Sequence, residues 1–301
     1  MPRLLIIVLL VAASGCSSEA GTVRLDLETT DPAEMLVFLM GPLGNSDSLR
    51  SAVEGETLNL EALGTRPSAL LAASAEDGVI TRQELVDAVT ADYYRAAGVP
   101  ETRADLLALL DTTSSLQHEV SGSMTRFRRR MHIARNAVRE ALERRLVDGQ
   151  PMTYSPGTVV IGEHLDEGQI PETTAMIRRD DGFWTFVAYD ADGNLTRSIE
   201  GDPDPLHVPA DCFGCHYGTR PYEPERSFPA EARPGPYGPR AVHVGPELRR
   251  ADVTTLLNEH ARRDDGLLGL YGTLYLSALK SGTLAPADSL DRTFVQALPG
   301  S

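Results

Sequence analysis

Residues 183–189 read Phe183-Trp-Thr-Phe-Val-Ala-Tyr189, a run of aromatic and β-branched side chains. Such residues favour an extended backbone, because they pack well on a pleated surface. The turn sequences Asp180-Asp-Gly182 and Asp190-Ala-Asp-Gly193 stand directly before and after the run. The run therefore predicts a β-strand bounded by two tight turns.

Two further strands are expected upstream of this one. Thr158-Val-Val-Ile-Gly162 follows the turn Ser155-Pro-Gly157, and Thr174-Ala-Met-Ile-Arg-Arg179 precedes the turn at 180–182. Three strands joined by short turns form an antiparallel meander, in which alternate side chains face one layer. We therefore expect an α+β protein, with an antiparallel β-sheet domain flanked by helical N-terminal and C-terminal regions.

A cysteine motif follows the expected sheet. Cys212-Phe-Gly-Cys-His216 holds two of the three cysteines in the chain and one of its seven histidines. Two thiols at this spacing can each bond one haem vinyl group, while the next imidazole binds the iron. We interpret the motif as the attachment site of one haem c, with Cys212 and Cys215 as covalent links and His216 as the proximal ligand.

Three other interpretations of the two cysteines stay open: a structural zinc site, a disulfide and a redox dithiol. Structural zinc requires four ligands, and only histidines and carboxylates remain after these thiols. A thioredoxin-like dithiol begins a helix after a strand, whereas Pro203, Pro205 and Pro209 precede this motif. A disulfide is the ordinary fate of paired cysteines in an oxidising compartment.

The N-terminus predicts export. Residues 1–16, MPRLLIIVLLVAASGC, place Arg3 before an apolar run that ends in small residues and Cys16. The run is shorter than the about 20 residues of a membrane-spanning helix, and its pattern is typical of a secretory signal peptide. Its last four residues resemble the bacterial lipobox, which implies a lipid anchor on Cys16 and a lipoprotein of the cell envelope, in the periplasm or at the outer membrane. A plain signal peptide cleaved elsewhere is the alternative.

Several segments together resemble the cytochrome P460 and cytochrome c′-beta family. They are Tyr154-Ser-Pro-Gly-Thr-Val-Val-Ile161, Met176-Ile-Arg-Arg-Asp180, Gly182-Phe-Trp-Thr-Phe-Val-Ala-Tyr-Asp190, the haem motif and Phe228, all within residues 150–230. The resemblance implies a β-sheet haem domain with five-coordinate iron, proximal His216 and an open distal face. That face binds nitric oxide or, in some members, oxidises hydroxylamine.

The distal-pocket candidates in this resemblance are Met176, Trp184 and Phe186, and Met176 is also a candidate sixth ligand. The hydroxylamine-oxidising members cross-link a strand lysine to the haem. Here the corresponding strand has arginines, and Lys280 is the only lysine in the chain. Because arginine stays protonated, it is a poor nucleophile for such a bond, and the cross-linked chemistry is not expected.

The flanking regions are expected to be helical. Residues 22–149 form a mainly helical N-terminal region, in which an apolar stripe between Ser114 and Asp148 approximates a helix. The arginine run, Arg126 with 128–130, is then a solvated helix face, or a contact for haem propionates or acidic partners. Residues 75–85 echo part of an EF-hand loop, but alanines at 73 and 75 replace oxygen ligands, so calcium is not expected. Residues 231–301 are expected to be a Pro/Gly-rich wrap and a helical tail.

Composition and the single haem motif limit the function. The net charge of −15 argues against nucleic acid, whose phosphates require clustered positive charge. No methionine follows Met176, so the sixth ligand is a histidine such as His243 or His260, an upstream residue, or absent. We expect a monohaem c-type cytochrome that serves one-electron transfer with a redox partner protein or binds a small gas. The alternatives are a haem enzyme acting on nitrogen oxides, hydroxylamine or peroxide, and a haem-bearing sensory or scaffold lipoprotein.

Overall fold

The computed structural model describes residues 21–29, 31–75, 77–110, 114–122, 127–150, 152–199, 204–212, 234–235, 238–239, 242–243 and 266–298. Over these ranges helices are mixed with two main sheets and no barrel is formed, so the general α+β class is confirmed. The signal peptide and Cys16 lie outside the described residues, as do Cys215, His216, Phe228 and His260.

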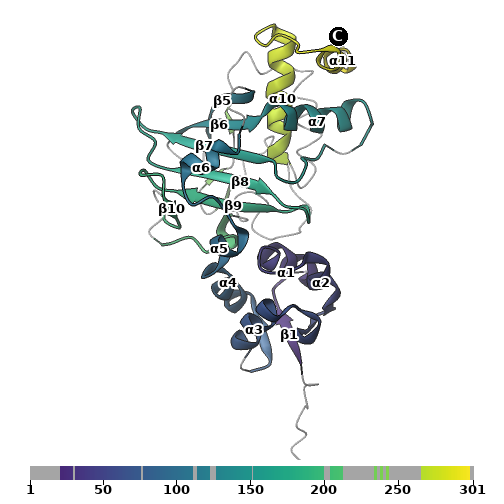
Figure 1. The fold of residues 1–301 in the computed structure, drawn as a ribbon, viewed down its shortest axis with the longest axis vertical. Helices are drawn as coiled ribbons and strands as arrows, with labels where there is room; N and C mark the ends of the chain where they lie inside the picture. The colour runs from purple at the N-terminus through teal and green to yellow at the C-terminus, as the bar shows by residue number, and fades with distance from the viewer. Residues whose placement is uncertain are drawn as a thin grey trace, which may run out of the picture.

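The larger sheet contains seven strands in the order β10-β9-β8-β7-β6-β5-β13 (Figure 1). Their bounds are β5 (Ser115–Gly122), β6 (Arg128–Ala134), β7 (Val159–Leu165), β8 (Thr173–Arg178), β9 (Trp184–Tyr189), β10 (Leu195–Thr196) and β13 (Val242–His243). All neighbours are antiparallel. The three strands expected from the sequence are β7, β8 and β9, and this prediction is confirmed. Gly182 and Gly193, at φ 91° and 84°, take the left-handed backbone that the flanking turns need.

The prediction of a helix between Ser114 and Asp148 is wrong for the first half of this segment. This segment forms β5 and β6, and only α7 (Arg135–Leu146) is helical. Apolar residues at 127, 131, 134 and 138 imitate a helical stripe, but pairing of β6 with both β5 and β7 holds residues 128–134 extended. The large sheet therefore reaches back to residue 115, before the boundary at 150 that the sequence suggested.

A smaller unit forms the lower end of the molecule in Figure 1. It contains a four-stranded sheet in the order β2-β3-β1-β4, which the sequence did not predict. Its elements are β1 (Thr22–Asp26), α1 (Pro32–Met40), α2 (Ser46–Ser51), β2 (Val53–Glu54), β3 (Thr57–Asn59), η1 (Leu60–Ala62), α3 (Thr65–Ser74), β4 (Val79–Thr81) and α4 (Arg82–Thr90). The EF-hand echo is the turn before α4, where the Glu84 carboxylate accepts bonds of 2.8 and 2.7 Å from the Thr81 amide and hydroxyl.

Further helices connect and cover the large sheet. α5 (Tyr93–Ala97) and α6 (Arg103–Ala108) follow the smaller unit, and α5 lies at the β9–β10 side in Figure 1. Arg179, just after β8, donates to the last-turn carbonyls of α1, at 2.7 Å to Val37 and 2.9 Å to Phe38. α7 packs with α10 (Gly266–Ser281) and α11 (Ser289–Ala297). Within the part of the chain that the structure describes, no helix combines the length and apolarity needed to cross a membrane.

Candidate functional site

One face of the large sheet, here called face A, changes in character along its strands. Directly paired residues share a face, so the register defines three rows across it. The apolar row is Leu116, Ile133, Val160, Met176 and Phe186; the small row is His118, Met131, Gly162, Thr174 and Ala188; the polar row is Arg129, His164 and Glu172. Face A therefore passes from hydrophobic to polar within four residues of each strand.

The structure brings the three distal-pocket candidates together on face A, at its apolar end. Met176, Trp184 and Phe186 are buried, with exposed fractions of 9%, 0% and 2%. Phe186 contacts Phe38 of α1 edge-on at 6.5 Å, and Trp184 contacts Tyr154 at 6.3 Å. These residues pack as hydrophobic core between the sheet and its neighbours.

The polar row carries a buried imidazole. His164 is only 5% exposed, and its Nδ1 lies 3.3 Å from the carboxylate of Glu172, which is 4% exposed. Neither ring nitrogen has a hydrogen-bond partner among the residues that the structure describes, because the approach to Glu172 lacks hydrogen-bond geometry. The Phe127 ring packs beside the imidazole at 5.8 Å. A buried polar atom without a partner costs about 1–3 kcal/mol, so this imidazole requires an explanation.

His118 of the small row is a second imidazole on the same face. Its Nε2 is likewise buried, and the described part of the chain supplies no hydrogen-bond partner for it. Burial lowers the pKa of His118. Burial, together with the positive charge of Arg129, lowers the pKa of His164 to about 3. Both imidazoles are therefore neutral at physiological pH, which is the form that binds metal ions.

The described end of the haem motif packs against the main hydrophobic core. Residues 210–212 have helical backbone, and the Asp211 amide donates to the His207 carbonyl at 3.1 Å. Cys212 is half-buried and packs against the hydrophobic core that contains Phe186 and Met176. A helical turn places residues i and i+3 on one face, as two thioether links to one flat group require.

Tyr94 of α5 binds the backbone of β9 and β10. The Tyr94 hydroxyl donates to the Thr196 carbonyl at 2.9 Å and accepts from the Ala188 amide at 3.3 Å. Burial raises the pKa of Tyr94, and Cys212 contributes in the same direction.

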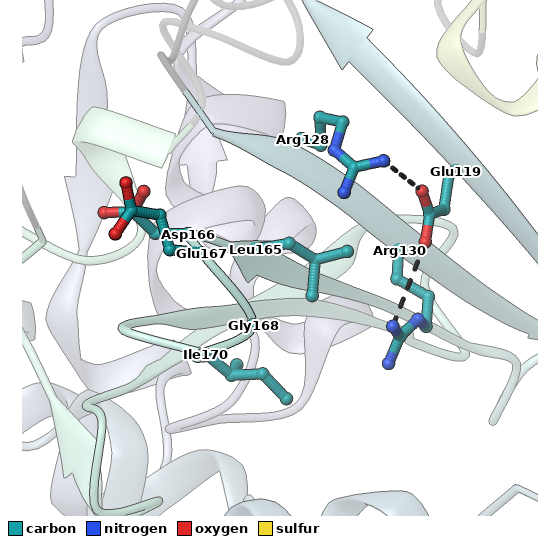
Figure 2. Close-up of a pocket in the computed structure, with 8 residues that line it drawn as sticks. All are labelled: Glu119, Arg128, Arg130, Leu165, Asp166, Glu167, Gly168 and Ile170. Carbon is teal, nitrogen blue, oxygen red and sulfur yellow. Dashed lines mark hydrogen bonds and ion pairs between the residues drawn. The ribbon is translucent and has the colours of Figure 1, made fainter.

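The opposite face, face B, holds a separate charged pocket of about 370 Å³. Figure 2 shows Glu119 between the guanidinium groups of Arg128 and Arg130, at 2.8 and 3.9 Å. The other lining residues, 165–168 and 170, belong to the end of β7 and the hairpin that follows it. The two arginines of this pocket are already paired with Glu119, and neither Cys212 nor its described neighbours line it.

Face B also contains a buried histidine, but this one is partnered. His132 Nε2 lies 2.8 Å from Glu163 Oε2, and Arg130 reaches the same oxygen at 3.5 Å. The hydrogen bond from His132 and the nearby positive charges lower the pKa of Glu163. The buried imidazole of His132 on face B therefore has a hydrogen-bond partner, whereas that of His164 on face A has none among the described residues.

The arginine run is divided between these faces. Arg128 and Arg130 belong to face B and Arg129 to face A, because successive strand residues point to opposite sides. Sequence reasoning missed His118 and His164 as possible site residues, and it placed Arg129 on a helix. For His118 and Arg129 the available signal was the alternation of residues in 116–120 and 127–133, but it was interpreted as a helix.

The described residues contain no cluster of three side chains able to hold a metal ion. Only the backbone of His243 is described, as part of β13. Comparison with protein-family models, with curated proteins and with solved structures finds no match to this chain.

Proposed function

We propose that this chain is an exported, lipid-anchored monohaem c-type cytochrome that serves one-electron transfer or small-gas binding. Cys212 and Cys215 hold the haem covalently and His216 is its proximal iron ligand. The observation that carries the proposal is the Cys-x-x-Cys-His spacing, which starts on a helical turn whose Cys212 packs against the main hydrophobic core. When bound, the haem supplies an iron that changes oxidation state or binds a gas.

The residues on face A fit such a group. The small row presents compact side chains, Gly162, Thr174 and Ala188, on three adjacent strands. Beside them the polar row supplies a buried imidazole whose Nε2 is unpaired within the described ranges. A flat cofactor with an apolar body and a polar, metal-containing centre needs both kinds of surface.

Covalent attachment is tested by maturing the chain with a haem c assembly system. We expect the denatured protein to keep one haem, seen as a mass increase of one haem and a haemochrome spectrum in pyridine. The variant Cys212→Ala with Cys215→Ala should lose both signals. The control is His207→Ala, which removes a half-exposed histidine five residues upstream and should keep the haem. A wild-type protein without covalent haem contradicts the proposal.

The lipid anchor is tested separately. Cys16→Ser should abolish incorporation of labelled fatty acid and release the protein from the membrane fraction while leaving haem attachment intact. Unchanged membrane association of this variant contradicts the anchor.

A further inference from the structure

We propose that the pocket on face B binds a small organic carboxylate. Arg128 and Arg130 receive the charged end of this molecule. Leu165 and Ile170 contact its apolar part. The site uses no residue of the haem motif, so the inference goes beyond the haem function proposed above and does not depend on it.

Strand register and a hairpin build this pocket. Arg128 of β6 is directly opposite Leu165 of β7, and directly paired residues lie side by side on one face. On the other side of β6, Arg130 is directly opposite Glu119 of β5. Two backbone hydrogen bonds of 3.1 and 2.8 Å close the turn at 166–169. The cavity of about 370 Å³ is therefore formed by ordered backbone, and its size is that of a small-molecule site, about 300–1,000 Å³.

The charged wall of the pocket is positive. It consists of two guanidinium groups, Arg128 and Arg130, and one carboxylate, Glu119, so its net charge is +1. In Figure 2 the carboxylates of Asp166 and Glu167 point away from the arginine side chains. They do not neutralise this wall at close range. A positive wall inside a chain of net charge −15 favours an anionic ligand.

Arg130 can accept such a ligand although it stands between two carboxylates. Its nitrogens lie 3.9 Å from Glu119 and 3.5 Å from Glu163, longer than the about 2.7–3.2 Å of an ordinary N–H···O hydrogen bond. Its side chain is also 39% exposed. A guanidinium group donates two parallel hydrogen bonds to a carboxylate, which makes it a specific receptor for this group.

The remaining ion pair of the wall is easily exchanged. Arg128 lies 2.8 Å from Glu119, but both side chains are largely exposed, at 68% and 46%. Exposed pairs of this kind contribute little to stability. A ligand carboxylate can therefore take the place of Glu119 between the two arginines, and Glu119 acts as an internal competitor for the site.

The opposite wall is apolar. Leu165 and Ile170 are both half-buried, and in Figure 2 their side chains extend from the β7–β8 hairpin toward the side that holds the arginines. Small-molecule sites combine such apolar surface with a few polar groups that fix orientation. A carboxylate with an apolar body contacts both walls, whereas an inorganic anion contacts only the charged one.

The test is calorimetric titration of the full-length protein with benzoate, which combines a carboxylate with an apolar ring. Wild type should bind benzoate at millimolar or lower concentration, more tightly than inorganic phosphate or benzylamine. Arg130→Gln should weaken benzoate binding about tenfold, because it removes a charge-assisted hydrogen-bond donor. Glu119→Gln should strengthen binding about threefold, because it removes the competing carboxylate. The control is Arg24→Gln, a half-exposed arginine that pairs with Asp26 in the smaller sheet, and it should bind like wild type.

Three outcomes overturn the proposal: no benzoate binding at millimolar concentrations, unchanged binding in Arg130→Gln, or phosphate or benzylamine binding as tightly as benzoate. An unfolded variant cannot imitate the expected pattern, because Glu119→Gln must gain affinity where Arg130→Gln loses it. The pyridine haemochrome of the same preparations reports covalent haem separately, so failure of the haem proposal is distinguishable from failure of this one.

Discussion

The apolar row and the polar row lie on the same face of one sheet, four residues apart along each strand, yet they are built differently. Every member of the apolar row is at most 9% exposed, and Phe186 is closed over by Phe38 of α1. The polar row buries His164 without a partner for Nε2 among the described residues. A sheet needs the first kind of surface to fold, whereas the second kind is costly unless a ligand completes it. The apolar row therefore contributes to the stability of the fold, whereas the polar row on the same face is the candidate for binding a ligand.

The largest expected effect is at the apolar row. Phe186→Ala should lower the free energy of unfolding by about 3–5 kcal/mol, because it removes a fully buried aromatic ring and leaves a cavity. Urea denaturation of the matured protein measures this loss. Phe186→Leu is the matched control and should cost about 1 kcal/mol. Equal effects of the two substitutions would show that the apolar row is not tightly packed.

Removing a buried polar group that has all its hydrogen-bond partners should also lower the free energy of unfolding substantially. The Asp291 carboxylate is fully buried and accepts from Arg135 and Arg139 at 3.0 Å and from the Tyr275 hydroxyl at 2.8 Å. Asp291→Ala leaves these groups uncompensated, so we expect a loss of about 3 kcal/mol. Asp288 is half-exposed; it pairs with Arg139 and caps α11 by accepting from the Leu290 and Asp291 amides, so its change to Ala should cost only about 1 kcal/mol. Thermal or urea unfolding distinguishes the two.

The strand pairing of the large sheet shows which parts of the fold could be predicted from the sequence. β7, β8 and β9 were predictable because the signals are local: β-branched and aromatic runs, with Gly182 and Gly193 at the turns. β5 and β6 were not, since residues at 127, 131, 134 and 138 satisfy a helical period equally well. Only pairing with distant β7 decides between the two structures. The same pairing puts His164 beside Arg129, so the polar row could not be assembled from sequence order.

The polar row is expected to behave in the opposite way from the apolar row. In a haem-free chain carrying Cys212→Ala and Cys215→Ala, His164→Leu should raise the free energy of unfolding by about 1–2 kcal/mol, because neither buried ring nitrogen of His164 has a hydrogen-bond partner among the described residues. The matched change on face B, His132→Leu, should lower it by a similar amount, since Glu163 is left buried without its imidazole. Urea denaturation measures both. If His164→Leu is as damaging as His132→Leu, His164 is an ordinary structural residue and the contrast between the faces disappears.

The smallest expected effect concerns the pH dependence of the partnered face. The hydrogen bond from His132 holds the pKa of Glu163 below its ordinary value of 4.5. The unfolded chain therefore binds more protons at Glu163 in the window between the two values. The stabilisation is fully present above pH 4.5 and is lost as the pH falls through the folded pKa. Glu163→Gln should cost about 1 kcal/mol at neutral pH, and the difference from wild type should shrink in acid. Glu119→Gln, a half-exposed carboxylate on the same face, should have little effect at either pH. A gap between Glu163→Gln and wild type that is constant with pH would show that Glu163 contributes through packing instead of charge.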